Sequence, residues 1–66
     1  MLKTYDGQQP ILGNGAWVDD LALVVGDVVL GDDVSVWPTT VIRGDVNVIR
    51  IGARTNVQDG TVVQVG

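Results

Sequence analysis

Two short segments of this protein contain the side chains that we single out as candidates for catalytic, metal or binding chemistry. The first is Arg43-Gly44-Asp45 and the second is Gln58-Asp59. The chain contains no His, so it has no imidazole to bind a metal or to transfer a proton near neutral pH. It also contains no Cys, which excludes a disulfide framework and a Cys-based zinc site.

Both segments also have a simple structural interpretation. Arg43 and Asp45 could form a local ion pair at a corner of the chain, and we favour a structural or interface role over a catalytic one. Asp59 precedes Gly60, and this dipeptide is common in turns. The Arg43-Gly44-Asp45 tripeptide lies inside a regular repeat, which argues against its being a cell-adhesion motif.

Two further motifs have weaker functional readings. Gly13-Asn14-Gly15 resembles a phosphate-binding loop only superficially, because no helix and no Lys follow it. Trp17 and Trp37 could mark a binding surface, but we favour large side chains that cover a coil end or a seam between subunits.

A repeat of about six residues organises the chain around these segments. When the sequence is cut into sixes with one three-residue interruption, Val48-Ile49-Arg50, every first position is Leu, Ile or Val, and the fifth positions are small or β-branched. Such a regular aliphatic period predicts buried rows. The first positions are Leu12, Val18, Val24, Leu30, Val36, Ile42, Ile51, Val57 and Val63.

Short strands separated by turns are predicted between these positions. Val, Ile and Thr are abundant after residue 11, whereas Glu, Lys and Met are absent there. Gly, Asn and Asp recur in step with the aliphatic residues and favour turns. Strands this short are suited to a parallel coil, in which each strand pairs with the equivalent strand one turn away.

The predicted fold is therefore all-β, a single-stranded parallel β-helix of about three coils with three flat faces. Its interior rows would be Leu12–Leu30–Ile51, Val18–Val36–Val57 and Val24–Ile42–Val63. The interruption would form a bulge or short loop at the corner after Asn47. We expect residues 1–11 to be an irregular lead-in or partial lid, and residues 12–66 to form the coils and to end in mid-coil.

The size of the chain favours self-association. A unit of 66 residues is marginal for a single hydrophobic core, and it has neither disulfides nor a Cys-based metal site to support it. An uncovered final coil would also present unpaired backbone groups that invite pairing with another chain. We therefore expect either a fragment of a longer coil or an edge that a partner chain covers.

The charge balance disfavours two classes of partner. Eight acidic residues, all Asp, against four basic residues give a net charge of −4 at pH 7. Nucleic acid and anionic membranes bind through excess Lys and Arg, so neither is an expected partner.

The N-terminal sequence has no apolar run typical of a secretory signal, and no window is long and apolar enough for a transmembrane helix. A cytoplasmic location is expected.

The stretch VWPTTVIRGDVNVIRIGARTNVQDGTVV resembles the γ-carbonic-anhydrase-like family of left-handed β-helix proteins. The shared motifs are the hexapeptide repeat, the RGD at a coil corner and the IGARTNVQDG segment one turn later. The resemblance covers most of the chain from about Leu12. It implies a left-handed coil, a homotrimer and, for the family, a zinc cofactor and the hydration of carbon dioxide.

The resemblance also implies roles for single residues. Arg43 and Asp45 would take part in ion pairs at the trimer interface. Gln58 and Asp59 would line the active site, with Gln58 hydrogen-bonded to a zinc-bound water. The first zinc-ligand histidine of the family follows six residues after that glutamine, and here Gln64 holds its place. Because a neutral amide is a poor zinc ligand and the other two family histidines are absent too, no cofactor is predicted for this chain.

Three functions remain open from the sequence. The first is a carbonic-anhydrase-like scaffold, truncated or catalytically inactive, that self-associates. The second is a structural module that only trimerises or stacks end to end. The third is a hexapeptide-repeat acyltransferase, which ranks last because those enzymes generally depend on a histidine base.

Overall fold

The computed structural model describes residues 1–66, which form eight β-strands and no helix. Because it has no helix, it has none long and apolar enough to cross a membrane. The strands are β1 (Leu2–Lys3), β2 (Ile11–Leu12), β3 (Trp17–Val18), β4 (Leu23–Leu30), β5 (Ser35–Val36), β6 (Val41–Ile51), β7 (Asn56–Val57) and β8 (Val62–Gln64).

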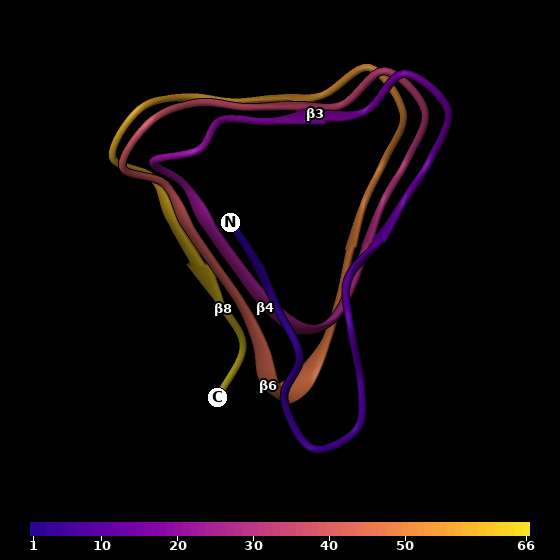
Figure 1. The fold of residues 1–66 in the computed structure, drawn as a ribbon, viewed down its shortest axis with the longest axis vertical. Helices are drawn as coiled ribbons and strands as arrows, with labels where there is room; N and C mark the ends of the chain where they lie inside the picture. Colours follow the sequence, from indigo (N-terminus) through magenta and orange to yellow (C-terminus); the bar gives the residue numbers. More distant parts are fainter.

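The strands stack as a parallel β-helix with a triangular cross-section (Figure 1). All pairs between these strands are parallel, in one sheet of order β1-β4-β6-β8 and another of order β3-β5-β7. The long strands β4 and β6 bend around a corner, so each contributes to two faces. Their first halves pair with β1 and β8, and the second half of β4 also pairs with β2. The predicted all-β solenoid of about three coils is confirmed.

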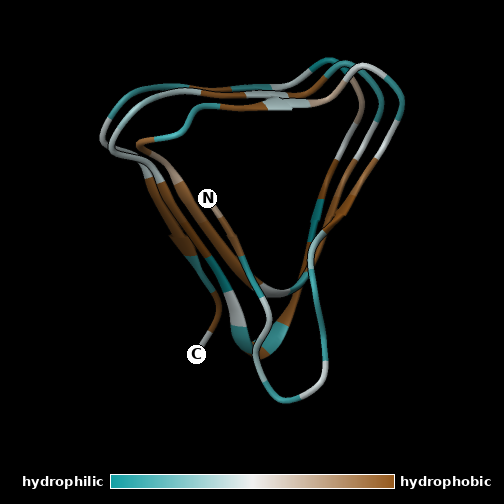
Figure 2. Ribbon diagram, viewed as in Figure 1, coloured by the Kyte–Doolittle hydropathy of each residue, from teal (hydrophilic) through white to brown (hydrophobic).

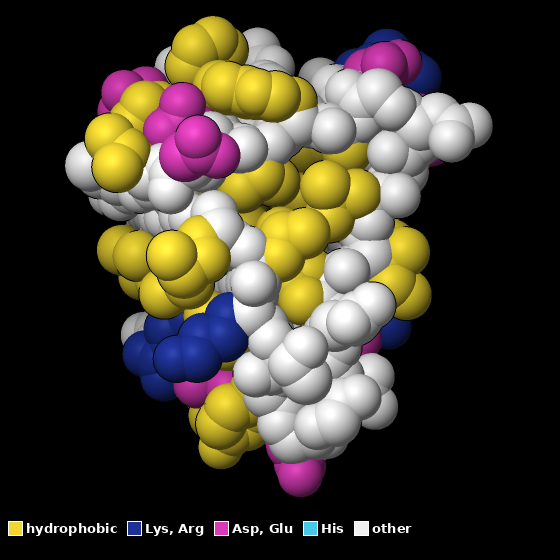
Figure 3. All heavy atoms as spheres, in the orientation of Figure 1, with side chains coloured by type: hydrophobic (Ala, Val, Ile, Leu, Met, Phe, Trp, Pro, Cys, Tyr) yellow, Lys and Arg dark blue, Asp and Glu magenta, His cyan; other side chains and the backbone are white.

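The three predicted interior rows are also confirmed by the strand register. Leu12, Leu30 and Ile51 are paired in one row. The other two rows are Val18–Val36–Val57 and Val24–Ile42–Val63. Hydrophobic residues lie mainly on the straight faces and polar residues at the corners (Figure 2). Seen down the axis, hydrophobic side chains gather in the middle of the triangle (Figure 3).

Burial is deepest in the central part of the coil. Val24, Leu30, Val36 and Ile42 have no exposed surface, and Thr40 is equally buried beside them. Leu12 and Val63, which belong to the outer coils, are only partly buried. The difference arises because a side chain in an outer coil has a neighbouring coil on one side alone.

The position of the interruption in the repeat was predicted wrongly. Ile49, placed by the sequence pattern in the bulge, pairs with Val28 and is 5% exposed, whereas Val46 is 71% exposed. Gly26 pairs with Gly44, and the next pair is Val28 with Ile49. Two steps along β4 therefore correspond to five steps along β6. Three extra residues therefore bulge out before Ile49. The sequence did not reveal this because Val46, Val48 and Ile49 are all aliphatic.

The corner beside this bulge requires glycine in both long strands. A Cβ atom on Gly44 would lie 2.5 Å from the carbonyl oxygen of Asp27, and one on Gly26 would lie 2.6 Å from the carbonyl oxygen of Gly44. Gly26 also has a φ of 82°, which favours glycine. The two coils therefore pack backbone against backbone at the corner that carries Arg43 and Asp45.

Residues 1–11, expected as an irregular lead-in, add a short strand and a turn to this face. Leu2 pairs with Val24, and the N-terminal ammonium group donates a hydrogen bond to the carbonyl oxygen of Ala22. A tight turn follows, closed by hydrogen bonds between Tyr5 N and Gln8 O (2.8 Å) and between Gln8 N and Tyr5 O (2.9 Å). The turn projects from the same corner as the bulge (Figure 1).

We predict that Ile49→Ala lowers the free energy of unfolding by about 2–5 kcal/mol, because it removes a buried side chain from the row of Val28. Val46→Ala, the matched truncation on the exposed part of the bulge, should change it by less than about 0.5 kcal/mol. Urea denaturation followed by circular dichroism measures both values. If Val46→Ala lowered the free energy of unfolding more than Ile49→Ala does, the bulge position inferred from the sequence would be correct after all.

Candidate functional site

Arg43 is the centre of a polar cluster on the outer side of the β1-β4-β6-β8 sheet. The side chain follows Ile42, which points inward, and it lies in register with Gln64 of β8. Its Nη2 donates to Oδ2 of Asp45 at 2.8 Å and its Nε donates to the same oxygen at 3.3 Å. Its Nη1 donates to Oε1 of Gln64 at 2.9 Å. One guanidinium group thus connects two coils and the bulge.

The geometry of this cluster favours the ionised form of Asp45. The hydrogen bond from Arg43 lowers the pKa of the Asp45 carboxyl group from its ordinary value of 3.8, while loss of hydration acts in the opposite direction. The backbone N–H of Val46 also donates to Oδ1 of Asp45 at 2.9 Å and lowers the pKa further. Asp45 is therefore a fixed negative charge at neutral pH and holds the start of the bulge in place.

A second ion pair joins β6 to β4 and was not singled out from the sequence. Arg50 Nη1 is 3.2 Å from Oδ1 of Asp27, and it also donates to the carbonyl oxygen of Ile49 at 3.0 Å. A sequence signal existed, since Gly26-Asp27 precedes Gly44-Asp45 by eighteen residues, which is one turn of the predicted coil. The pairing with Arg50 could not be inferred from the sequence, because it requires the bulge to lie before Ile49.

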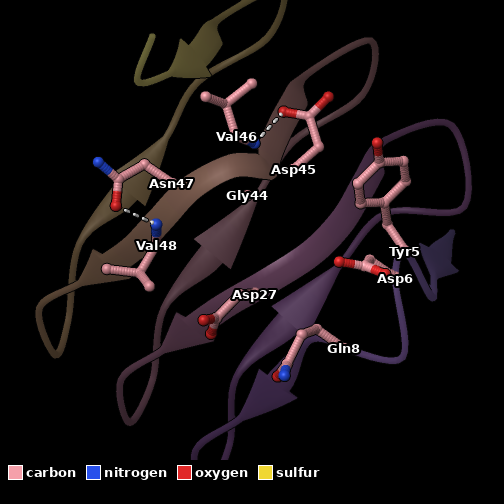
Figure 4. Close-up of a pocket in the computed structure, with 9 residues that line it drawn as sticks. All are labelled: Tyr5, Asp6, Gln8, Asp27, Gly44, Asp45, Val46, Asn47 and Val48. Atoms are coloured by element: carbon pink, nitrogen blue, oxygen red, sulfur yellow. Dashed lines mark hydrogen bonds between the residues drawn. The ribbon is translucent and has the colours of Figure 1, made fainter.

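A cavity of about 190 Å³ opens between the bulge and the N-terminal turn. It is lined by Tyr5, Asp6 and Gln8 of the turn, Asp27 of β4 and residues 44–48 of β6 (Figure 4). Three carboxylates line it, and Arg50 and Arg43 pair with those of Asp27 and Asp45. No three acidic side chains of the molecule are grouped closely enough to hold a metal ion.

Gln58 and Asp59 lie at a different corner, in the turn between β7 and β8. The carbonyl oxygen of Gln58 accepts hydrogen bonds from Oγ1 of Thr40 (3.0 Å) and from Oγ1 of Thr61 (2.7 Å). Gly60 completes the turn with a φ of 75°. The fold therefore brings Gln64 to the ion pair of Arg43 and Asp45. The Gln58-Asp59 segment forms no hydrogen bond with these three residues.

Comparison with known proteins identifies the family of this coil. A profile described as bacterial transferase hexapeptide (six repeats) matches residues 9–44, which is more than half of the chain. The chain belongs to this hexapeptide-repeat family. The crystal structure of a hexapeptide transferase family protein from Anaplasma phagocytophilum superposes with a TM-score of 0.89, at 43% identity over 92% of this chain and 37% of the other.

Curated relatives of this hexapeptide-repeat chain include a carbonic anhydrase. Protein YrdA of Escherichia coli is 49% identical over 98% of this chain and 35% of its own length. A protein named carbonic anhydrase from Geobacillus kaustophilus is 41% identical over 96% of this chain and 35% of its own length. The resemblance inferred from the RGD and NVQDG motifs is thus confirmed. This chain spans about a third of the length of these two relatives.

We predict that Asp45→Asn destabilises the folded state at neutral pH and that this effect disappears in acid. A carboxyl group whose pKa is lowered by folding stabilises the protein above its ordinary pKa, and the stabilisation is lost as the pH falls through the lowered value. The difference in free energy of unfolding between the parent and the variant should therefore be constant above pH about 5 and shrink below pH about 4.

Thermal unfolding between pH 2 and pH 7 measures this difference. Asp33→Asn is the matched control, because Asp33 is exposed and takes part in neither ion pair. An equal pH dependence for the two variants would show that the Arg43–Asp45 pair contributes nothing specific.

Proposed function

We propose that this chain is a carbonic-anhydrase-like hexapeptide-repeat scaffold that self-associates and that does not hydrate carbon dioxide by itself. The observation that carries the proposal is Gln64, which occupies the place of the first zinc-ligand histidine in the resembled family. Its Oε1 accepts a hydrogen bond from Arg43 Nη1 at 2.9 Å. The relatives named for carbonic anhydrase activity support the ancestry of the scaffold.

The chemistry of this position disfavours zinc. Zinc in catalytic sites is held by three ligands, usually imidazole, thiolate or carboxylate groups, and hydration depends on the metal to lower the pKa of bound water. The amide of Gln64 is neutral, and the guanidinium group beside it would repel a divalent cation. The chain has no His or Cys to supply any of the ligands.

The outer side of the β1-β4-β6-β8 sheet supports self-association. Leu23, Val41 and Val62 are paired in register, and they alternate with the inward row of Ile42. Val62 is 62% exposed. An aliphatic row on the solvent side of a sheet, beside the polar Arg43 cluster, is the mixed character expected of a subunit interface. We propose that copies of the chain, most simply three, associate through this face.

A cytoplasmic location remains a prediction from the composition and the N-terminal sequence. Acyl transfer, which the name of the family suggests, ranks below the scaffold role because the chain lacks the histidine base expected for that reaction. Binding of an acyl thioester, measured by calorimetry, would reverse this ranking.

We predict that the purified chain binds no stoichiometric zinc and accelerates carbon dioxide hydration no more than the buffer does, because the metal ligands are missing. Elemental analysis after dialysis against zinc, and a stopped-flow hydration assay, measure the two quantities. Gln64→His should still fail both tests, since it supplies one ligand of the three required. Stoichiometric zinc with hydration activity in the parent chain would contradict the inactive scaffold.

Self-association predicts a molar mass near that of a trimer in sedimentation equilibrium. Val62→Lys should shift the mass toward the monomer at the same concentration, because it places a charge on the proposed interface. Ile11→Lys is the matched control, since Ile11 is 61% exposed and lies on a different face. A monomer at every concentration tested would contradict this part of the proposal and leave the zinc result unaffected.

A further inference from the structure

The turn Gly13-Asn14-Gly15 joins β2 to β3 at a corner of the first coil (Figure 1). A hydrogen bond from Ala16 N to Gly13 O (3.2 Å) closes this turn. Gly15 has a φ of 73°, a conformation that favours glycine. Asn14 and Gly15 are both exposed. The proposed scaffold function assigns no role to this turn.

An Asn followed by Gly can react with its own backbone. The Gly nitrogen gives up its proton to hydroxide and attacks Cγ of the Asn side chain, so that a C–N bond forms. The Cγ–Nδ2 bond breaks, and the amide group takes a proton from water and leaves as ammonia. Water then opens the cyclic imide at either carbonyl, which gives Asp or isoaspartate. Glycine permits this attack best, because no side chain shields its nitrogen or restricts its backbone.

The two groups that would react are not held by the fold. The backbone N–H of Gly15 makes no hydrogen bond within the chain. The side-chain amide of Asn14 makes none either, although its backbone N donates to Oδ1 of Asp32 at 2.9 Å. The Asn14 carbonyl oxygen accepts a hydrogen bond from Asp33 N at 3.0 Å, and the attack requires this bond to open. Opening costs little here, because the turn has a neighbouring coil on one side alone.

The other two Asn residues of the chain differ from Asn14 in both respects. Asn47 and Asn56 are each followed by Val, whose branched side chain restricts the backbone and shields its nitrogen. Oδ1 of Asn47 accepts a hydrogen bond from Val48 N at 2.8 Å, and Oδ1 of Asn56 accepts one from Oγ of Ser35 at 2.6 Å. The reaction is therefore expected at Asn14 and not at the other two.

We propose that Asn14 is a site of self-catalysed deamidation and that the product loosens the first coil from the second. Isoaspartate adds a methylene group to the backbone of a turn that packs tightly. A Cβ atom on Gly13 would lie 2.5 Å from Oδ1 of Asp32, and one on Gly15 would lie 2.3 Å from Oδ1 of Asp33. The new carboxylate would also be repelled by these two carboxylates. This inference goes beyond the proposed scaffold function.

The test is incubation of the full chain at about pH 8 and about 37 °C, followed by peptide mapping with mass spectrometry. We expect the mass change for replacement of NH2 by OH at Asn14, at a rate at least about tenfold higher than at Asn47 or Asn56. The rate should rise with pH, because the Gly15 nitrogen must lose its proton. Asn14→Gln, which moves the amide one methylene further from that nitrogen, should remain unmodified over the same period.

Hydrogen exchange measures the loosening of the coil. The amide of Asp33, which donates to Asn14 O, should exchange at least about tenfold faster in the deamidated form, separated by ion-exchange chromatography, than in the parent chain. The amide of Arg54, which donates to Asp32 O at 2.8 Å between the next two coils, is the matched control and should change by less than about twofold. Asn14→Asp adds the same charge without the extra methylene and should show a smaller increase at Asp33.

Three results would overturn the proposal. Loss of ammonia from a peptide of residues 11–18 but not from the folded chain would show that the fold protects the turn. Equal rates at all three Asn residues would show that the turn has no special reactivity. Unchanged exchange of the Asp33 amide in the deamidated form would show that the coil stays closed. None of these results bears on zinc binding or on self-association through the β1-β4-β6-β8 face.

Discussion

Burial of stacked Leu, Ile and Val side chains inside three parallel faces is the interaction on which the whole molecule depends. Each interior side chain contacts the equivalent residue one coil away, as Val24 does Ile42 and Leu30 does Ile51. Such stacking lets strands of two or three residues persist, because each is supported by its neighbours in the next coil. The apolar area available to 66 residues is nevertheless small, and the outer coils remain partly open.

The corner formed by Gly26 and Gly44 carries the two ion pairs of the molecule. Close backbone approach at the two glycines lets β4 and β6 bend together, and three extra residues of β6 leave the coil there. The bulge brings Asp45 to Arg43 and allows Arg50 to reach Asp27. Both guanidinium groups are thereby paired with carboxylates of the same corner.

Two of the three faces differ clearly in the side chains that they expose. The β1-β4-β6-β8 face combines an aliphatic row with the Arg43 cluster, which is the surface that we propose for contact between copies of the chain. The β3-β5-β7 face carries the two Trp rings beside Asp19. Gln64 belongs to the first face, where its hydrogen bond to Arg43 occupies the amide oxygen that a metal would need. The proposed self-association and the proposed absence of metal binding therefore both involve the pair of Arg43 and Gln64.

The sequence by itself determined the period of the coil and the identity of the interior rows, because a six-residue recurrence of aliphatic side chains has few stable solutions other than stacked parallel strands. It also indicated the family through the RGD and NVQDG motifs, although the hand of the coil came only from that resemblance. The tertiary structure decided which aliphatic residue of this stretch points into the core. Val46, Val48 and Ile49 are equally apolar, and only the register of β6 against β4 selects Ile49. The contacts of Arg43 with Gln64, of Arg50 with Asp27 and of Trp17 with Trp37 likewise join residues about twenty positions apart, and such distances in sequence become neighbours only when one coil lies upon the next.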